Sequence, residues 1–308
     1  MDFELSSTQR ALLEALDTLL DRHAGTERSR ELAELGAYDR ELEAALREGG
    51  FEELFGAEEA GPLDATLAVE RIAMRLGAVT PVPRMLVLPA LGLEPPEGPV
   101  VLAVAGDPGP IRYGAQATRM LLADGPRCVL AELDPDTAEP VPSAYGYPLA
   151  RPVSRKSREL GPGTAAAMMN WWRVGVSAEA VGMMRQAMDI AVTYAKDRKV
   201  FGRALGSFQA LQHRLAELSV AVEGARWLVY EAAFSGARAE SAAVAAAHTM
   251  AALGRVTRET HQIMGAVGLT TEHDLHLWTL RMQTLRTELG GRRGHDRAVV
   301  AARWGRAS

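Results

Sequence analysis

Proline is spread so unevenly along this chain that it decides where long helices can form. Of the 16 prolines in 308 residues, 14 lie between Pro81 and Pro152, and none follows Pro162. A proline inside a helix costs about 3 kcal/mol, because its ring removes a hydrogen-bond donor and clashes with the preceding turn. The middle of the chain is therefore predicted to be non-helical, whereas the part after Pro162 is free to be helical.

The segments on either side of the prolines have helical periodicity. Ser6 and Gln9 fit a capping box, and the leucines after them recur on one face, so residues 8–23 should form an amphipathic helix. Two more helical patterns precede the prolines, over residues 38–53 and 63–76. In the last part of the chain the periodicity predicts helices near 164–198, 207–234, 237–264, 273–289 and 294–304.

Short strands are expected between these helices. Val100–Val104 and Cys128–Leu133 are apolar runs bounded by Gly, Pro and Asp, a pattern typical of strands. The predicted fold class is therefore mainly α with a small β domain. Its domains are expected at residues 1–96 (helical), 97–153 (a small β domain) and 154–308 (a helical bundle). Alanine-rich residues 237–264 should make a close contact between helices or between subunits.

Composition excludes several classes of protein. The formal net charge of −5 argues against a general nucleic-acid surface. A single cysteine, Cys128, excludes an intramolecular disulfide and fits a reducing compartment. Neither a signal peptide nor a run of about 18 apolar residues is visible, so we expect a soluble, cytoplasmic protein without a membrane span.

The stretch Tyr194–Gln212 joins the first two long helices after the prolines. Gly202 and Gly206 permit a sharp reversal, and Ser207 is placed to cap the second helix. Cations stand beside aromatic and amide side chains in this turn: Arg198, Lys199, Arg203, Phe201, Phe208 and Gln209. Such a corner suits a phosphorylated, ring-bearing ligand. The alternative is an ordinary interhelical turn with solvated cations.

Three blocks of this chain resemble the acyl-CoA dehydrogenase family. The segment Arg173–Gln212 is similar to the flavin-binding region of that family's C-terminal helical domain, through Arg198, Lys199, Phe201, Gly202, Phe208 and Gln209. A Gln-x-x-Gly-Gly-x-Gly block is matched by Gln262, Gly265, Ala266 and Gly268, with alanine replacing one glycine. A Thr-x-Glu-His-Asp-x-His block, in the form of short family members, is matched by Thr270, Glu272, His273, Asp274 and His276.

The resemblance extends in a reduced form to the first half of the chain. The stretch LREGGFEELFGAEEAG is similar to a shortened N-terminal domain of the family. Residues 97–153 resemble a reduced version of the middle β domain, which normally covers the flavin, although the usual strand motifs that contact the flavin ring cannot be placed there. The implied architecture is an N-terminal helical domain, a reduced β domain and a C-terminal four-helix bundle.

The resemblance implies FAD as the cofactor. Arg198 and Lys199 would meet the flavin pyrophosphate, usually that of a neighbouring subunit, and Phe208 and Gln209 the adenosine side. Backbone amides of the Gln262 block would approach the same phosphates, slightly crowded by Ala266. The cofactor-binding residues so implied are Arg198, Lys199, Phe201, Phe208, Gln209, Gln262, Gly265, Ala266 and Gly268.

The resemblance also implies a glutamate that removes the α-proton of a CoA thioester. The family's usual Glu-Gly pair would fall on Leu289 and Gly290, with Glu288 one position earlier. On a helix one position is a rotation of about 100°, which aims the carboxylate elsewhere unless the helix ends early. The other family position for the base holds Trp172. Glu288 is therefore the candidate catalytic base, and Arg173 either supports it or forms a structural ion pair.

The implied function is FAD-dependent dehydrogenation of an acyl-CoA. Flavin contacts without a base in its usual place resemble short family members that form half of an α2β2 enzyme acting on bulky thioesters such as steroid side chains. The expected partners are an acyl-CoA substrate, a second acyl-CoA dehydrogenase chain or a second copy, and an electron acceptor protein. The alternatives are a non-catalytic subunit that completes another chain's flavin site and a flavin-free acyl-CoA binder.

The cluster of acidic residues and histidines at residues 272–276 has a second interpretation. Glu272 and His276 share a helical face and could ligate a metal. A helix start explains the cluster more simply, with Thr271 or Asp274 as the cap and Glu272 near the positive helix end. We therefore predict no metal site.

Overall fold

The first part of the chain is helical. The computed structural model describes residues 4–107 and 109–305. Its N-terminal helices are α1 (Ser7–His23), α2 (Thr26–Leu35), α3 (Arg40–Glu48) and α4 (Pro62–Met74). The predicted capping box is present at α1, where Ser6 Oγ accepts from the backbone N–H of Gln9 and the Gln9 side chain accepts from that of Ser6. The sequence pattern did not predict α2.

The helix predicted over residues 38–53 is shorter in the structure. Gly49 is the C-cap of α3, and Gly50 has a φ of +74°, in the left-handed region that glycine adopts easily. The chain then continues as a separate 3₁₀ turn, η1 (Phe51–Gly56). The glycine pair therefore splits one apparent helical pattern into two elements.

The prediction that the proline-rich region is non-helical is wrong at its start. A π-helical turn, η2 (Val82–Val87), runs directly into the short helix α5 (Leu88–Ala90). Pro83 is tolerated because it lies in the first turn of this helical run, where a backbone donor has no partner to lose, and the π-helical turn η2 comes before Pro89.

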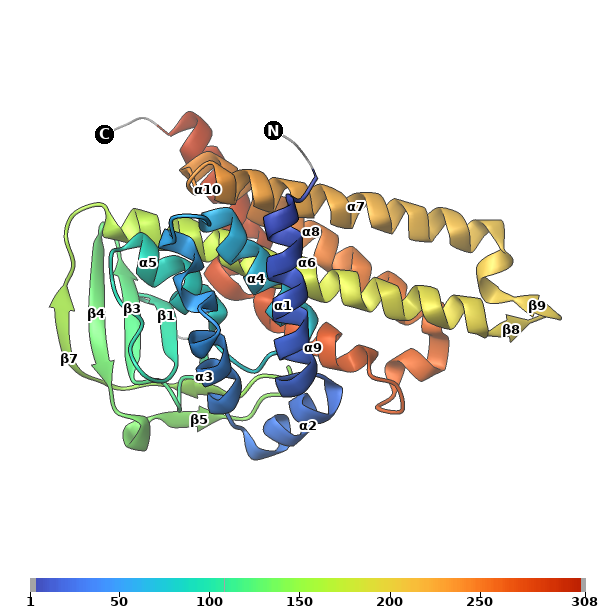
Figure 1. Cartoon of the computed structure of the whole chain (residues 1–308), viewed down its shortest axis with the longest axis horizontal. Coiled ribbons are helices and arrows are strands. Elements are labelled where there is room, and N and C mark those ends of the chain that lie inside the picture. Colours follow the sequence, from blue (N-terminus) through green and yellow to red (C-terminus); the bar gives the residue numbers. More distant parts are fainter. Residues whose placement is uncertain (1–3, 108, 306–308) are drawn as a thin grey trace.

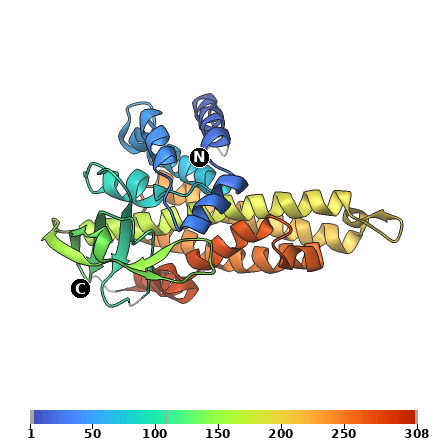
Figure 2. The ribbon, with the colours of Figure 1, turned by 90° about the horizontal axis from the view of Figure 1, so that it is seen from below.

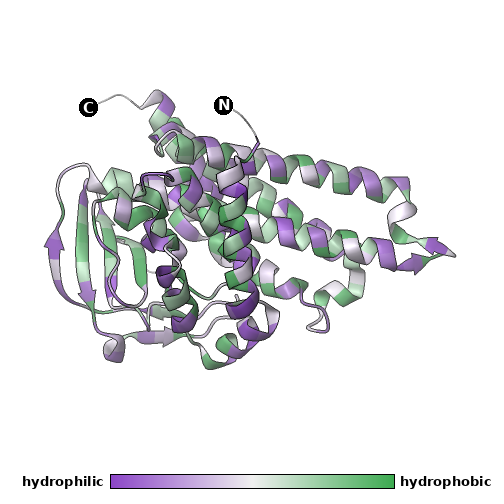
Figure 3. Cartoon of the chain, in the orientation of Figure 1, coloured by the Kyte–Doolittle hydropathy of each residue, from purple (hydrophilic) through white to green (hydrophobic). Residues whose placement is uncertain are grey.

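Two small sheets follow. Their strands are β1 (Val100–Val104), β2 (Ile111–Arg112), β3 (Arg119–Asp124), β4 (Arg127–Leu133), β5 (Glu139–Val141), β6 (Leu149–Arg151) and β7 (Ser154–Glu159), with a 3₁₀ turn η3 (Pro135–Thr137) between β4 and β5. One sheet has the order β1-β3-β4-β7, in which β1 and β3 are parallel and the other pairs antiparallel. The other is antiparallel, in the order β2-β6-β5. Edge strand β7 is exposed at every position and is more hydrophilic than the strands inside the sheet (Figure 3).

Long helices form the rest of the molecule. They are α6 (Thr164–Asp197), α7 (Gln209–Phe234), α8 (Ala239–Met264), α9 (Leu275–Leu285) and α10 (Gly291–Trp304). α6 runs through the centre and packs against α4, α7, α8 and α9. The sheets lie at one end of α6, and the hairpin of β8 (Lys199–Val200) and β9 (Arg203–Ala204) projects at the other (Figures 1 and 2). None of the described helices has the length and apolar character needed to cross a membrane.

Two glycines let α6 pass close to its neighbours. A Cβ added to Gly182 would lie 2.1 Å from the carbonyl oxygen of Glu70 in α4. One added to Gly175 would lie 2.3 Å from Cγ1 of Val82 in η2. Both neighbours belong to packed elements, so moving either one away from α6 would disrupt its packing.

We expect Gly182→Ala to lower the free energy of unfolding by about 1–3 kcal/mol, because α4 must shift to admit the methyl group. Urea denaturation followed by circular dichroism measures this loss. Gly161→Ala is the control, since a Cβ there meets nothing within 4 Å. Equal losses in the two variants would contradict the close-packing explanation.

Candidate functional site

A cavity of about 370 Å³ lies between the sheets and the C-terminal helices. Its size falls in the range of roughly 300–1,000 Å³ typical of small-molecule sites. Its apolar lining includes Pro83, Val100, Leu102, Val104, Leu149 and Trp172. The charged residues on the same lining are Asp107, Arg112, Glu179 and Glu288. A mostly apolar wall with a few convergent charges can hold an apolar ligand in a defined orientation.

Glu288 reaches this cavity because the helix before it ends early. α9 stops at Leu285, where a helix to residue 289 had been predicted, and Glu288–Gly290 forms a short 3₁₀ turn, η6. Leu289 has left-handed backbone angles (φ 55°, ψ 32°), and Gly290 and Gly291 also have positive φ. The exception foreseen in the sequence, an early helix end, therefore applies and turns the carboxylate inward.

The Glu288 carboxylate is held by one contact on each oxygen. Trp172 Nε1 of α6 donates to Oε2 at 2.7 Å, and Arg112 Nε of β2 lies 2.7 Å from Oε1. The side chain of Glu288 is 14% exposed. Trp172, which the sequence resemblance places at the other expected position for a base, therefore contacts the Glu288 carboxylate directly.

Arg112 also binds a second, deeper carboxylate. Its Nη1 and Nη2 donate to the two oxygens of Glu179 at 3.2 and 2.9 Å. Burial raises the pKa of Glu179, while the positive charge of Arg112 opposes that rise. Burial lowers the pKa of Arg112, but the charges of Glu179 and Glu288 outweigh it and the pKa is raised. The guanidinium is therefore a fixed positive charge between two carboxylates.

Tyr147 separates this group from a second buried arginine. The Arg112 and Arg281 guanidinium carbons lie 4.9 and 4.8 Å from the Tyr147 ring centroid. Arg281 donates to the backbone oxygens of Leu76, Gly77 and Gly146 and to Ser29 Oγ. Burial raises the pKa of Tyr147, so the phenol remains neutral at physiological pH. This network ties the N-terminal helices and the sheets to the C-terminal bundle behind the cavity.

Arg173, the expected supporting residue, does not contact Glu288. Its Nη1 makes only long contacts to Met169 O (3.3 Å) and Asn170 Oδ1 (3.5 Å), and within residues 4–107 and 109–305 it forms no ion pair. Burial lowers its pKa. His295 is fully buried, and burial together with Arg173 lowers its pKa to about 4. Neither role expected for Arg173 is therefore visible in the described part of the chain.

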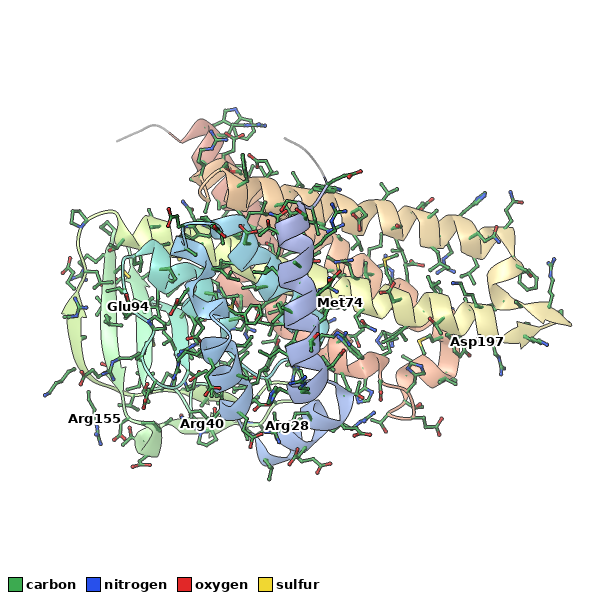
Figure 4. All side chains as sticks on the ribbon, viewed as in Figure 1. Arg28, Arg40, Met74, Glu94, Arg155 and Asp197 are labelled. Atoms are coloured by element: carbon green, nitrogen blue, oxygen red, sulfur yellow. The ribbon has the colours of Figure 1, made fainter. Side chains whose placement is uncertain are left out.

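The turn within residues Tyr194–Gln212, which we call the cationic turn, lies at the end of α6 opposite to the cavity. Arg198 is the C-cap of α6 and Lys199 opens β8; both are exposed, and neither forms an ion pair with a described residue. Figure 4 labels Asp197, the last residue of α6, beside the hairpin. Arg198 lies 26 residue positions after Trp172 along α6, which at a rise of 1.5 Å per residue is about 39 Å.

The tip of the hairpin presents an aromatic side chain to solvent. Phe201 (φ 53°) and Gly202 (φ 81°) are both left-handed, as in a type I′ turn, and Phe201 is 92% exposed. Behind the tip, the Arg203 guanidinium lies 3.9 Å from the centroid of the half-buried Phe208 ring. Gln209 is the exposed first residue of α7.

The predicted cap of α7 is wrong. Ser207 Oγ donates to the carbonyl of Ala204, and no side chain caps the helix, because its N-cap position is held by Phe208. The 3₁₀ turn η4 (Leu205–Ser207) thus joins the hairpin directly to the helix.

The Gln262 block lies beside the cationic turn. Gln262 is exposed in the last turn of α8, Gly265 is the C-cap with a φ of 62°, and the exposed Ala266 and the buried Gly268 belong to the 3₁₀ turn η5 (Gly265–Leu269). Ile263 packs with Ala191 and Ala195 of α6 and with Leu211 and Leu215 of α7. The structure therefore brings the two predicted phosphate-binding blocks together at one end of the bundle.

The third sequence block has a structural role at the start of α9. Asp274 pairs with Arg30 of α2 and makes no capping bond. The backbone N–H of Leu275 donates instead to Nδ1 of His273 at 3.3 Å, so neither Thr271 nor Asp274 caps the helix. No group of three potential metal ligands occurs among residues 4–107 and 109–305.

Sequence reasoning missed three residues of the cavity network: Arg112, Glu179 and Tyr147. Glu179 left a signal, because it is a lone carboxylate in an otherwise apolar stretch of α6, and such a residue needs a buried partner. Arg112 and Tyr147 left none, since each lies in an irregular or two-residue element whose place depends on tertiary packing.

Comparison with known proteins finds a matching family model and relatives of similar sequence. Residues 161–304 match the family model "Acyl-CoA dehydrogenase, C-terminal domain". "Acyl-CoA dehydrogenase IpdE2" of Mycolicibacterium smegmatis is 33% identical over 319 residues, which cover 96% of this chain and 99% of the relative.

Solved structures share the fold. The ChsE4–ChsE5 complex of Mycobacterium tuberculosis contains a chain with a TM-score of 0.81 and 22% identity, covering 97% of this chain and 98% of that one. Butyryl-CoA dehydrogenase of Megasphaera elsdenii has a TM-score of 0.82 and 21% identity, covering 98% and 99%. These likenesses confirm the predicted fold class.

Proposed function

The chain belongs to the acyl-CoA dehydrogenase family, and we propose that it works with FAD as one subunit of a heteromeric enzyme that oxidises a CoA thioester between Cα and Cβ. The observation that carries this proposal is the Glu288 carboxylate, held by Trp172 and Arg112 on the lining of an apolar cavity. A volume of about 370 Å³ suits the acyl part of a thioester.

Glu288 acts in this proposal as the base. Its carboxylate takes the α-proton, and the electron pair of the broken C–H bond forms the new double bond as the β-hydride leaves. A bound flavin supplies the acceptor for that hydride. The apolar wall excludes water from the carboxylate, and Trp172 and Arg112 hold its two oxygens in one orientation.

The residues at the far end of α6 fit the anionic part of a dinucleotide. Arg198 and Lys199 are exposed cations without a described acidic partner, and phosphate would supply one. A Cβ on Gly265 would meet nothing within 4 Å, so the space above that backbone is open. Arg198, Lys199, Phe201, Phe208 and Gln209 from one block, and Gln262, Gly265, Ala266 and Gly268 from the other, are our proposed cofactor-binding residues.

The distance between the two regions supports an assembly. About 39 Å of helix separates Trp172 from Arg198, more than one extended dinucleotide reaches. The cavity and the cationic turn of one chain therefore serve two different flavins, each completed by another subunit. The exposed Phe201 at the hairpin tip fits this arrangement, because a left-handed aromatic residue in solvent gains a packing partner only from another molecule.

Charge removal at the turn tests the cofactor assignment. We expect Arg198→Gln with Lys199→Gln to raise the Kd for FAD by about tenfold or more, since hydrogen bonds to charged groups contribute about 1.5–3 kcal/mol each. Retained FAD is measured by visible absorption after desalting, for the chain alone and co-expressed with a candidate second subunit. Arg127→Gln, an exposed arginine in the sheet at the other end of α6, is the control. Equal FAD retention in all three proteins would contradict the assignment.

The competing function is a non-catalytic subunit that completes another chain's flavin site. In this alternative the cationic turn still contacts the flavin, but Glu288 takes no part in the reaction. Full acyl-CoA oxidation by the complex carrying Glu288→Gln in this chain would favour it.

A further inference from the structure

Two carboxylates share one guanidinium on the lining of the cavity. Arg112 gives Nη1 and Nη2 to Glu179 at 3.2 and 2.9 Å, and Nε to Glu288 at 2.7 Å. The Glu179 side chain is 4% exposed and the Arg112 side chain 15%. Glu179 comes from α6, Arg112 from β2 and Glu288 from the turn after α9, so three separate elements build this contact.

The two carboxylates do not use Arg112 in the same way. Glu179 has the bidentate contact, the stronger geometry for an arginine–carboxylate pair, and Glu288 has a single nitrogen. When Glu288 accepts a proton, Arg112 and Glu179 remain a matched pair, and no buried charge is left alone. If Glu179 were absent, Arg112 would be compensated by Glu288 alone and would stabilise its ionised form more strongly.

We propose that Glu179 is a positioning residue that sets the basicity of Glu288 by acting through Arg112. The proposal rests on the function proposed above, in which Glu288 is the base. Glu179 neutralises most of the guanidinium charge, so Glu288 keeps an affinity for the α-proton while Arg112 still orients it. Among the described residues, Tyr147 lies against Arg112 and within electrostatic range of Glu288, Arg281 lies on the Tyr147 ring, and Asp107 is on the cavity lining.

Trp172 provides a readout that needs neither substrate nor flavin. Its Nε1–H donates to Glu288 at 2.7 Å, so its fluorescence should change when that carboxylate is protonated. The chain has five tryptophans. The emission of Trp172 is therefore obtained by subtracting, from the fluorescence of each protein, the fluorescence of the same protein carrying Trp172→Phe. Glu288→Gln should abolish the pH-dependent part of the difference.

Two variants separate the roles of the neighbouring charges. Glu179→Gln removes a negative charge, so the fluorescence midpoint should fall by about one pH unit. Adding Arg112→Gln to that variant removes the positive charge as well, and the midpoint should then rise by about 1–3 pH units relative to Glu179→Gln. In the double variant Glu288 is the one carboxylate left in this group; it keeps the hydrogen bond from Trp172 and lies on the cavity lining rather than in the closed interior.

Glu70→Gln is the matched control. Glu70 is also a buried glutamate, 4% exposed, paired with Arg185 and bonded to Tyr230, but it does not line the cavity. A purely structural role for Glu179 predicts that both glutamine variants lose stability and neither moves the midpoint. An unmoved midpoint in Glu179→Gln, or a titration that persists in Glu288→Gln, would overturn the inference.

The pH profile of kcat/KM gives the second readout. In the flavin-loaded complex, with butyryl-CoA, octanoyl-CoA and cyclohexanecarboxyl-CoA as probes, the acid limb should move in the same directions as the fluorescence midpoint. The plateau of Glu179→Gln should fall several-fold, because a weaker base transfers the proton more slowly. If Glu288→Gln loses activity but the acid limb of Glu179→Gln does not move, the inference about Glu179 is refuted and the proposed function stands. If Glu288→Gln retains activity, the proposed function itself is refuted.

Discussion

Replacing Glu288 with glutamine should reduce acyl-CoA oxidation by about 10²- to 10⁴-fold, the usual contribution of a positioned general base. Glutamine keeps the length of the side chain, and its oxygen still accepts from Trp172 Nε1, so the cavity should keep its shape. What is lost is the carboxylate that we propose takes the α-proton. Binding of FAD at the site we propose at the other end of α6 should be unchanged.

Proton exchange measures this step separately from oxidation. The rate at which the α-hydrogen of the bound thioester exchanges with deuterium in D₂O, followed by NMR, should fall by the same factor as turnover. Glu272→Gln, an exposed glutamate in the loop before α9, is the control and should exchange at the parent rate. If Glu288→Gln exchanges and turns over normally, the base is another residue.

The largest expected loss of stability is at Arg84, outside the cavity. Arg84 is 1% exposed; its Nε and Nη2 donate to Glu52 at 2.6 and 2.9 Å, and Nη1 donates to the carbonyls of Pro96 and Gly98. Arg84→Met removes both of these hydrogen bonds from the buried Glu52 and leaves it only the 3.5 Å contact with Arg47. We expect the free energy of unfolding to fall by about 3–5 kcal/mol.

A second substitution tests the cause of that loss. Arg84→Met combined with Glu52→Met removes both charges and should be more stable than Arg84→Met alone, because the buried carboxylate that has lost its bidentate partner is gone as well. Arg292→Met is the control: its pair with Asp296 is exposed, and the loss should be below about 1 kcal/mol. Urea denaturation of the four proteins measures the series. A similar loss in Arg84→Met and Arg292→Met would contradict the role of burial.

The helical half of the chain was predictable because its signals are local. Helices near 164–198, 207–234 and 237–264 were expected and appear as α6, α7 and α8, with ends within two residues of the prediction. Apolar spacing and glycine stops are properties of a short segment and need no knowledge of its neighbours. The prediction failed where apolar helical spacing and a helix-breaking residue occur together. At Gly49 and Gly50 the helix ends although the spacing continues, and at the prolines of η2 a helical turn forms although prolines are present.

The candidate site was only half predictable for the same reason. The cationic turn is one continuous segment, so its residues could be identified from the sequence and their assignment to FAD stays a prediction. The cavity, in contrast, brings together Arg112 of β2, Trp172 and Glu179 of α6, and Glu288 of η6, which are three separate elements. No spacing rule connects positions this far apart.

The sequence by itself determined the partition into a proline-rich strand region and a helical bundle, because proline acts on its own backbone and on the turn before it. It also determined the family, through three ordered blocks near the turns of that bundle. The tertiary structure alone decided that α9 ends at Leu285 and that Glu288 meets Trp172 and Arg112. The direction of a carboxylate depends on where its helix stops and on which distant side chains compensate its charge, and only packing sets both.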